Sequence, residues 1–256
     1  MNKTNRIYLL LLLTVIAFPA QSFGSAPKDK KASTDTIYTN ISGQGNELIF
    51  IIKKGKYHNH PTMAIWLEDL KGHYLQPLFV TKFFATGIFD HGPLNDTVWG
   101  NNPGLAYRPA ALPYWNHKRT DQPDMDKLVP NPDNPVPDGY TSATPKADFV
   151  LKTRSDISLP DTFRVMLEVN QTWDWNEYWT NNKYPDNIHY KSSSQPSVVY
   201  SVIIDLQNPI KEYWLQPVGH GHYSGMDGNL YTNLQTLTTA LEILETIKVK
   251  VVEKKK

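Results

Sequence analysis

The sequence predicts an all-β fold, namely an immunoglobulin- or fibronectin-like β-sandwich that carries one long irregular insertion. Three observations support this prediction. Short alternations of apolar and polar residues recur along the chain, and Pro-, Asn- and Gly-rich segments separate them. Only residues 234–244 resemble an amphipathic helix, and they suit a short strand as well. Seven or eight short strands favour a sandwich over a barrel, although the sequence alone does not decide between the two.

Eight segments account for the expected strands, and each has the alternation of a strand with one buried face. In chain order they are residues 47–54, 62–69, 74–84, 147–154, 162–170, 197–205, 211–219 and 245–253. The turn LKGH (70–73) joins the second and third segments into a hairpin. Residues 85–146 form the insertion, which is rich in Pro, Asn and Asp and has no periodicity. Its aromatic residues predict that it packs on the sandwich: Trp99, Tyr107, Tyr114 and Trp115.

The amino-terminal residues predict an export signal. Residues 1–25 combine a basic start with an apolar run at 7–18, a proline and small residues. The run is too short to span a bilayer comfortably, so we expect a cleaved signal, with an uncleaved amino-terminal anchor as the alternative. Residues 26–45 are expected to be a flexible lead-in, and residues 46–253 a single domain. The mature chain is then periplasmic or extracellular and has no transmembrane segment.

Composition excludes several classes of function. The 256 residues carry a formal net charge of +1, which gives no argument for nucleic-acid binding. The chain contains no cysteine, so catalysis by a thiolate and zinc–thiolate sites are excluded. No phosphate-binding P-loop, dinucleotide-binding glycine motif or G-x-S-x-G motif occurs.

Two pairs of alternating histidines form a candidate metal site. His58 and His60 follow the first strand, and His220 and His222 lie at the end of the seventh. In an extended segment residues i and i+2 point to the same side, so each pair would present two imidazoles together. Neutral imidazole binds copper and zinc ions. If the two strand ends meet, four nitrogens converge on one metal ion; the alternative is two polar loops with hydrogen-bonded histidines.

The segment NQTWDWNEYWTNNKYPDN (170–187) forms a candidate ligand site. Its candidate ligand-binding residues are Trp173, Asp174, Trp175, Glu177, Tyr178 and Trp179. Aromatic faces beside amides and carboxylates suit sugar rings or flat ligands, because they offer apolar area and oriented hydrogen bonds together. The alternative is a structural cluster that holds the insertion. Strand-like spacing puts Trp173 and Trp175 on one face, where we expect both to be largely buried, with Tyr178 or Trp179 at a cleft edge.

Three segments carry a family resemblance. Residues 60–82 (HPTMAIWLEDLKGHYLQPLFVTK) contain an apolar-Trp-x-Glu-Asp strand, a glycine turn and a second apolar strand. Residues 137–154 (PDGYTSATPKADFVLKTR) and 161–175 (DTFRVMLEVNQTWDW) place a small-residue stretch before two strands. Over about residues 45–252 the chain resembles the predicted periplasmic proteins called domain of unknown function 2271, whose second half is similar to the immunoglobulin-like module of flagellar hook-capping proteins. The resemblance implies a sandwich fold and a periplasmic location.

The chain departs from this family at two points. Ser142 stands where the family commonly has glycine, and the usual Trp-Asp-Gly turn is missing. The stretch DGYTSAT (138–144) also resembles an acceptor sequence on which a flavin transferase esterifies FMN to the final threonine. This resemblance implies that Thr144 is the acceptor and that Asp138 belongs to the recognition sequence. The alternative is a plain turn that leads into the next strand, and Pro145 restricts the backbone of Thr144 in either case.

These patterns leave several functions open. The leading hypothesis is an exported, non-catalytic ligand-binding or accessory module of the bacterial envelope, whose partner is an unknown envelope ligand or protein. It rests on the lack of a recognisable nucleophile–base arrangement in the sequence and on the aromatic segment. The alternatives are a copper or zinc enzyme or redox protein built on the histidine pairs, and a covalent FMN carrier in extracytoplasmic electron transfer.

Overall fold

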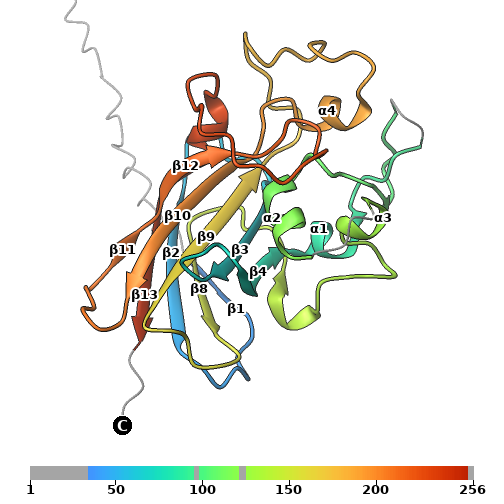
Figure 1. Ribbon diagram of the computed structural model, residues 1–256. Helices are drawn as coiled ribbons and strands as arrows, with labels where there is room; N and C mark the ends of the chain where they lie inside the picture. The colour runs from blue at the N-terminus through green and yellow to red at the C-terminus, as the bar shows by residue number, and fades with distance from the viewer. Residues whose placement is uncertain (1–33, 95–97, 121–124, 253–256) are drawn as a thin grey trace, which may run out of the picture. The chain divides into compact units, whose positions relative to one another are not determined.

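The computed structural model describes residues 34–94, 98–120 and 125–252. The expected export signal at 1–25 and the first part of the expected lead-in lie outside the described residues. In the described part of the chain, strands predominate and form two large sheets and a small third one (Figure 1). The two large sheets share one hydrophobic core. The predicted all-β sandwich is therefore confirmed.

The first large sheet has five strands in the order β1-β8-β2-β13-β11. They are β1 (Asp35–Tyr38), β2 (Glu47–Lys54), β8 (Phe149–Arg154), β11 (Tyr213–Trp214) and β13 (Leu244–Val252). All pairs are antiparallel except that β1 runs parallel to β8. β1 lies inside the segment 26–45 that we expected to be flexible, so that expectation is wrong for these four residues. Backbone pairing with β8 orders them, and Ile37 packs against the core.

The second large sheet has six strands in the order β12-β10-β9-β3-β4-β7. They are β3 (Thr62–Glu68), β4 (Tyr74–Thr81), β7 (Thr141–Ser142), β9 (Thr162–Asn170), β10 (Val198–Asp205) and β12 (Gln216–His220). β3 and β4 form the predicted hairpin, whose turn uses Gly72 at a φ of 85°. The small sheet pairs β5 (Ile88–Phe89) with β6 (Gly104–Leu105).

The chain crosses between the large sheets as in an immunoglobulin-like sandwich. β2 and β8 are neighbours in the first sheet, while β10, β9, β3 and β4 follow one another in the second. Its first three crossings between these sheets come after β2, after β7 and after β8, and it crosses again after β10, after β11 and after β12. This is the Greek-key connection of that fold. β13 then pairs with β2 on the side away from β8.

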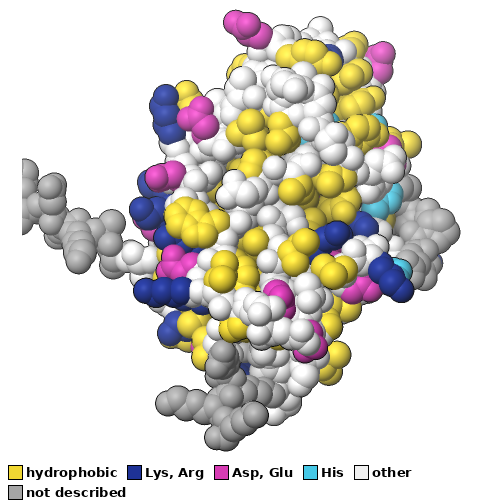
Figure 2. Space-filling view, turned by 60° about the vertical axis from the view of Figure 1, so that its left-hand side comes forward, with side chains coloured by type: hydrophobic (Ala, Val, Ile, Leu, Met, Phe, Trp, Pro, Cys, Tyr) yellow, Lys and Arg dark blue, Asp and Glu magenta, His cyan; other side chains and the backbone are white. Residues whose placement is uncertain are grey.

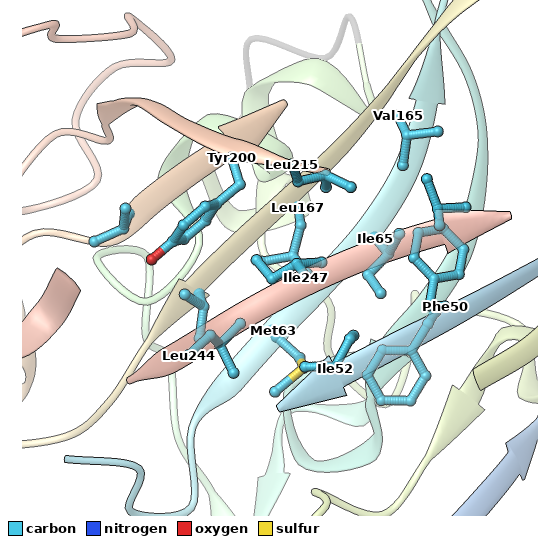
Figure 3. Packing of buried hydrophobic residues seen from close by; sticks show 14 of the residues in the cluster. Phe50, Ile52, Met63, Ile65, Val165, Leu167, Tyr200, Leu215, Leu244 and Ile247 are labelled. Carbon is cyan, nitrogen blue, oxygen red and sulfur yellow. The ribbon is translucent and has the colours of Figure 1, made fainter. Parts of the chain in front are cut away.

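The core between the sheets follows from the alternation seen in the sequence. Leu48, Phe50 and Ile52 of β2 are at most 1% exposed, whereas the residues between them are only half-buried. Figure 3 shows Phe50 and Ile52 packed with Met63, Ile65 and Leu167 of the other sheet and beside Ile247 of the neighbouring strand β13. Each such side chain contributes about 1.5–3 kcal/mol by leaving water. The strands therefore pack through the faces that the sequence predicts.

A second hydrophobic cluster covers the outer face of the six-stranded sheet. All seven positions of β3 are buried, because one face meets the core and the other meets the insertion. Trp66 of β3 lies 6.0 Å from Tyr114, and Phe84 lies 6.0 Å from Trp115, measured between ring centroids. The predicted packing of the insertion on the sandwich is thus confirmed for Tyr114 and Trp115, whereas Tyr107 is exposed, and Figure 1 shows α1 and α2 beside β3 and β4.

The insertion expected at 85–146 is not wholly irregular. The helices and 3-10 turns of the described residues are α1 (Lys82–Thr86), α2 (Pro113–Lys118), α3 (Met125–Leu128), η1 (Asp138–Tyr140), α4 (Ile188–Ser193) and η2 (Thr239–Glu242). Four of them fall wholly or partly within the insertion, and each is too short to produce a periodic pattern in the sequence. Within the described residues, no helix combines the length and apolar character that a membrane crossing requires.

Residues 211–219 differ from the expectation of a single strand. They form β11 in one sheet and β12 in the other, with Leu215 between them. The N–H of Leu215 donates to the carbonyl oxygen of Ile247 at 3.0 Å, and its side chain is 5% exposed in the core. The buried Leu215 lies where the chain passes from one sheet to the other. The alternation of buried and exposed residues therefore continues through the crossing, and the sequence pattern does not reveal it.

Candidate functional site

A cavity of about 340 Å³ lies where β3 begins and β9 ends. Its lining combines the loop before β3, the helix α1, the strand β5 and the segment that follows β9. The lining residues are Asn59, His60, Thr62, Phe83, Phe89, Asp90, His91, Trp99, Arg108, Thr172 and Trp173. The size lies at the lower end of the range for small-molecule pockets, and the lining is mixed aromatic and polar, as such pockets are.

Arg108 is the buried charge of this cavity. Its side chain is 5% exposed, yet among the described residues no carboxylate lies within ion-pair distance of it. The guanidinium donates from Nη1 to the Thr172 hydroxyl at 3.1 Å and from Nη2 to the Ser192 carbonyl oxygen at 3.1 Å. Its Nε has no hydrogen-bond partner in the described structure. Loss of hydration on burial lowers the pKa of Arg108 to about 10, so the group stays charged at neutral pH.

Aromatic rings form the walls around this charge. Phe83 and Phe89 stack with ring centroids 6.3 Å apart and an interplanar angle of 25°. Trp99 and Trp173 meet edge to face at 6.1 Å and 85°. The Arg108 guanidinium lies 5.3 Å from the centroid of Phe89, within the range of a cation–π contact. The cavity therefore combines flat apolar surfaces with the buried cation of Arg108.

Two lining residues adopt a backbone conformation that side chains disfavour. His60 has a φ of 48° and Trp173 a φ of 57°, both in the left-handed region. Such a residue costs of order 1 kcal/mol or more and persists only where its surroundings hold it. The Trp173 N–H donates to the Ser192 carbonyl oxygen at 3.2 Å, the same oxygen that accepts from Arg108. The strain places the Trp173 ring at the cavity rather than along the line of β9.

A polar network behind Trp173 keeps this segment in place. The Asp174 carboxylate accepts a hydrogen bond from the Thr239 hydroxyl, and burial raises its pKa. The Asn176 side-chain oxygen accepts from the backbone N–H of Trp179 at 2.7 Å. Its side-chain nitrogen donates to the Thr236 carbonyl oxygen at 2.9 Å. The segment after β9 is thus a fixed loop and no longer an extended strand.

The expected burial of the tryptophans is therefore wrong. Trp173 is 51% exposed and Trp175 is 56% exposed, whereas Trp179 is 7% exposed. β9 ends at Asn170, and the left-handed turn at Trp173 removes the strand geometry on which the expectation depended. The Trp179 indole N–H donates to the Thr236 hydroxyl at 3.1 Å, as a buried indole requires.

The six predicted ligand-binding residues are thus divided by the structure. Trp173 lines the cavity, whereas Asp174 and Trp179 are buried parts of the supporting loop. The other three lie on the surface and do not line the cavity: Trp175, Glu177 and Tyr178. The aromatic segment therefore contributes one wall residue, and its remaining members support or surround that wall.

The histidine pairs occupy separate environments. The ring nitrogens of His58 lie 3.2 Å from the Ile243 carbonyl oxygen and 2.9 Å from the Pro145 carbonyl oxygen. His60 is exposed and lines the cavity. Within the described ranges, no group of three or more His, Cys, Asp or Glu side chains is arranged to hold a metal ion. The structure does not bring His58 and His60 together with the second pair in such a group.

The second histidine pair is held by its own loop. His220 is 7% exposed, and its ring stacks on Tyr231 with centroids 5.4 Å apart. The Nδ1 atom of His222 accepts from the backbone N–H of Ser224 at 3.2 Å. Burial lowers the pKa of both histidines, so both are neutral at pH 7. These contacts match the alternative reading of hydrogen-bonded loop histidines.

Thr144, the residue that the flavin-acceptor resemblance implies, is 8% exposed. It follows β7, which pairs in parallel with β4 at Val80 and Thr81. The side chain is therefore largely covered in the folded chain, and this position does not favour its use as an acceptor. The structure likewise places Asp138 in the 3-10 turn η1, on the surface.

Sequence reasoning missed Arg108 and the phenylalanine wall. Arg108 stands alone in an aperiodic part of the insertion, and only the fold brings it to Thr172 and Ser192, 64 and 84 residues further on. A single arginine in a proline-rich segment carries no spacing signal. Comparisons with known proteins add no assignment, since no family model, curated protein or solved structure matches the chain. The family resemblance stays a prediction.

Proposed function

We propose that this protein is an exported, non-catalytic ligand-binding module, and that its binding site is the cavity bounded by Trp99, Trp173, Phe83 and Phe89. The observation that carries the proposal is a cavity of ligand size, about 340 Å³, with aromatic walls, and with strained backbone at two lining residues, His60 and Trp173. The strained backbone at His60 and Trp173 lowers the stability of the fold, and the sandwich does not require it. A binding site that is already formed before the ligand arrives would explain why the strain is kept.

The contacts of the titratable side chains support binding rather than catalysis. Among the described lining residues, no hydroxyl or carboxylate group is hydrogen-bonded to a histidine, as a nucleophile–base pair requires. The ring of His60 bonds the side chain of Asn59, and the ring of His91 lies 3.1 Å from the Gly100 carbonyl oxygen. These groups are therefore arranged as polar contacts at the cavity.

A second cavity is a weaker candidate for the binding site, because its lining has fewer charged groups. It has about 240 Å³ and lies between the sheets, lined by side chains of β10, β11, β12 and β13 and by Leu241. Its lining includes no histidine, arginine or lysine, and Glu245 is its one ionisable acid. Figure 2 shows the side of the molecule that carries β11, where hydrophobic side chains are dispersed among polar ones. A gap between two sheets needs no ligand to explain it.

Saturation-transfer NMR with aromatic fragments tests the proposal. The panel contains bicyclic compounds of one size that are neutral, cationic or anionic, and the protein is used without a tag. We expect at least one fragment to bind, and binding to be lost in Trp173→Ala but kept in Trp175→Ala. Both residues are half-exposed neighbours, and only Trp173 lines the cavity. Binding that survives Trp173→Ala, or that is absent for every fragment, would refute the proposed site.

Export is tested separately. Expression of the whole chain in a bacterial host should place it in the periplasm or medium, with an intact mass that corresponds to cleavage near residues 20–25. An uncleaved chain found in the cytoplasm would contradict this part of the proposal and would leave the binding site as it stands.

A further inference from the structure

Arg108 has no acidic partner in the part of the chain that the structure describes, and this determines which ligand the cavity suits. A buried cation normally has an acidic partner, because loss of hydration is costly unless a nearby negative charge offsets it. Arg108 has two neutral oxygen acceptors and, in the described residues, no acid. Its pKa is lowered by burial alone, with no acidic group raising it.

The guanidinium also has unused hydrogen-bond donors. An arginine side chain has five N–H donors in a planar fork. Two of the five are used, one by the Thr172 hydroxyl and one by the Ser192 carbonyl oxygen, which leaves three without a partner in the described structure. A planar fork with spare donors matches the two oxygens of a carboxylate, and such charge-assisted pairs are stronger than neutral ones.

The other charged groups around the cavity do not satisfy Arg108. Asp90 lines the cavity but is exposed to solvent and makes no ion pair with Arg108. His60 and His91 are exposed as well. Solvent screens charges at such positions, whereas Arg108 acts where the effective dielectric constant is lower. An entering anion therefore meets its main electrostatic attraction at Arg108.

We infer that the cavity selects a flat aromatic carboxylate, with Arg108 as the group that binds its carboxylate. The inference rests on the proposed function and adds the chemical class of the ligand. The Phe83–Phe89 stack and the Trp99–Trp173 pair supply apolar faces for the ring. One cation amid apolar walls suits a singly charged carboxylate better than a doubly charged phosphate, for which more donors or cations would be needed.

Calorimetric titration with 2-naphthoate and its neutral isostere 2-naphthamide tests the inference. The two probes share size and ring system and differ in charge. We expect 2-naphthoate to bind wild-type protein about 10- to 100-fold more tightly than 2-naphthamide. In Arg108→Gln this preference should disappear, so that both probes bind equally. Arg119→Gln, which removes an arginine outside the cavity that also has an unpartnered Nε, should keep the preference.

The outcomes separate the two proposals. Equal affinity of the two probes for wild-type protein would overturn the carboxylate inference and leave the ligand-binding function standing. Binding of neither probe up to about 1 mM, with no other fragment bound, would overturn both. Because Arg108→Gln risks misfolding, the wild-type comparison decides without a variant. Tighter binding of 2-naphthyl phosphate than of 2-naphthoate would also overturn the inference, since it would show a dianion site.

Discussion

The insertion meets the six-stranded sheet in two regions, and each region buries a charged side chain. In the first, which we call the α2 dock, Glu168 of β9 accepts the backbone N–H groups of Tyr114 at 3.2 Å and Trp115 at 2.6 Å. It also accepts the hydroxyl of Ser197. In the second, the cavity, Arg108 has two neutral acceptors and no acid among the described residues.

The difference between the two regions shows that a buried ionisable side chain can either stabilise the fold or remain available to a ligand. At the α2 dock the chain supplies three donors to the Glu168 carboxyl group, which is 0% exposed, and these contacts hold the insertion on the sheet. At the cavity the hydrogen-bond partners of Arg108 are incomplete among the described residues, and one wall residue, Trp173, is half-exposed on strained backbone. A complete set of partners stabilises the fold, whereas an incomplete set beside a cavity leaves interactions for a ligand.

The largest expected effect belongs to the α2 dock. Trp115 is 1% exposed and packs on Phe84 with ring centroids 6.0 Å apart. Trp115→Ala should lower the free energy of unfolding by about 3–5 kcal/mol, because it removes a large buried ring and leaves a cavity. Chemical denaturation measures this. Trp175→Ala is the control, and a loss below about 1 kcal/mol for Trp115→Ala would show that the insertion is not part of the folded core.

The second prediction uses the pH dependence of the α2 dock. Burial raises the pKa of Glu168 to about 7, above the ordinary value of 4.5. Between these values the folded protein holds a proton that the unfolded chain has released. The contribution of Glu168 to stability should therefore be greatest below pH 4.5 and fall as pH rises to 7, by up to about 3 kcal/mol.

Glu168→Gln tests the cause of this pH dependence. Tyr114 and Trp115 donate to different oxygens of Glu168, so the amide keeps an acceptor for only one of them, and the variant should be less stable at every pH. The amide does not titrate, so the unfolding free energy should lose that slope between pH 4.5 and 7. Urea denaturation at several pH values supplies the data. An unchanged slope in the variant would assign the pH dependence to other groups.

The third prediction concerns strain at the cavity and involves about 1 kcal/mol. Because Trp173 has a φ of 57°, glycine should suit this position better than alanine. Trp173→Gly should therefore be more stable than Trp173→Ala by about 1 kcal/mol. At Trp175, which has no positive φ, the order should be reversed or absent. Thermal melts of the four variants decide this, and alanine ahead of glycine at position 173 would remove the argument from strain.

The fold could be predicted because the alternation of apolar and polar residues shows directly which face of each strand is buried. Leu48, Phe50 and Ile52 stand two residues apart, and that spacing places them on one face whatever the rest of the chain does. The expectation was wrong where local pattern and tertiary contacts differ. Residues 211–219 alternate throughout, but the chain changes sheets at Leu215, and β1 is ordered by its pairing with β8 and by the packing of Ile37 on the core.

The site could be predicted only in part. The aromatic segment after β9 drew attention to Trp173, which does line the cavity, but strand spacing misassigned its burial. The alternation of apolar and polar residues does not indicate which residue has a left-handed backbone conformation, as Trp173 does. Arg108 could not be identified from the sequence, because what distinguishes it is that no acid among the described residues lies beside it in the folded chain.

The most direct test of the cavity as the ligand site is a spectrum of the indole N–H groups of ¹⁵N-labelled protein, recorded during titration with 2-naphthoate. The chain has seven tryptophans, each of which contributes one such resonance. We predict that the resonances of Trp99 and Trp173 move, because both rings line the cavity, while those of Trp175 and Trp214 stay in place. Movement confined to Trp175 or Trp214, with Trp99 and Trp173 unchanged at saturation, would contradict the account.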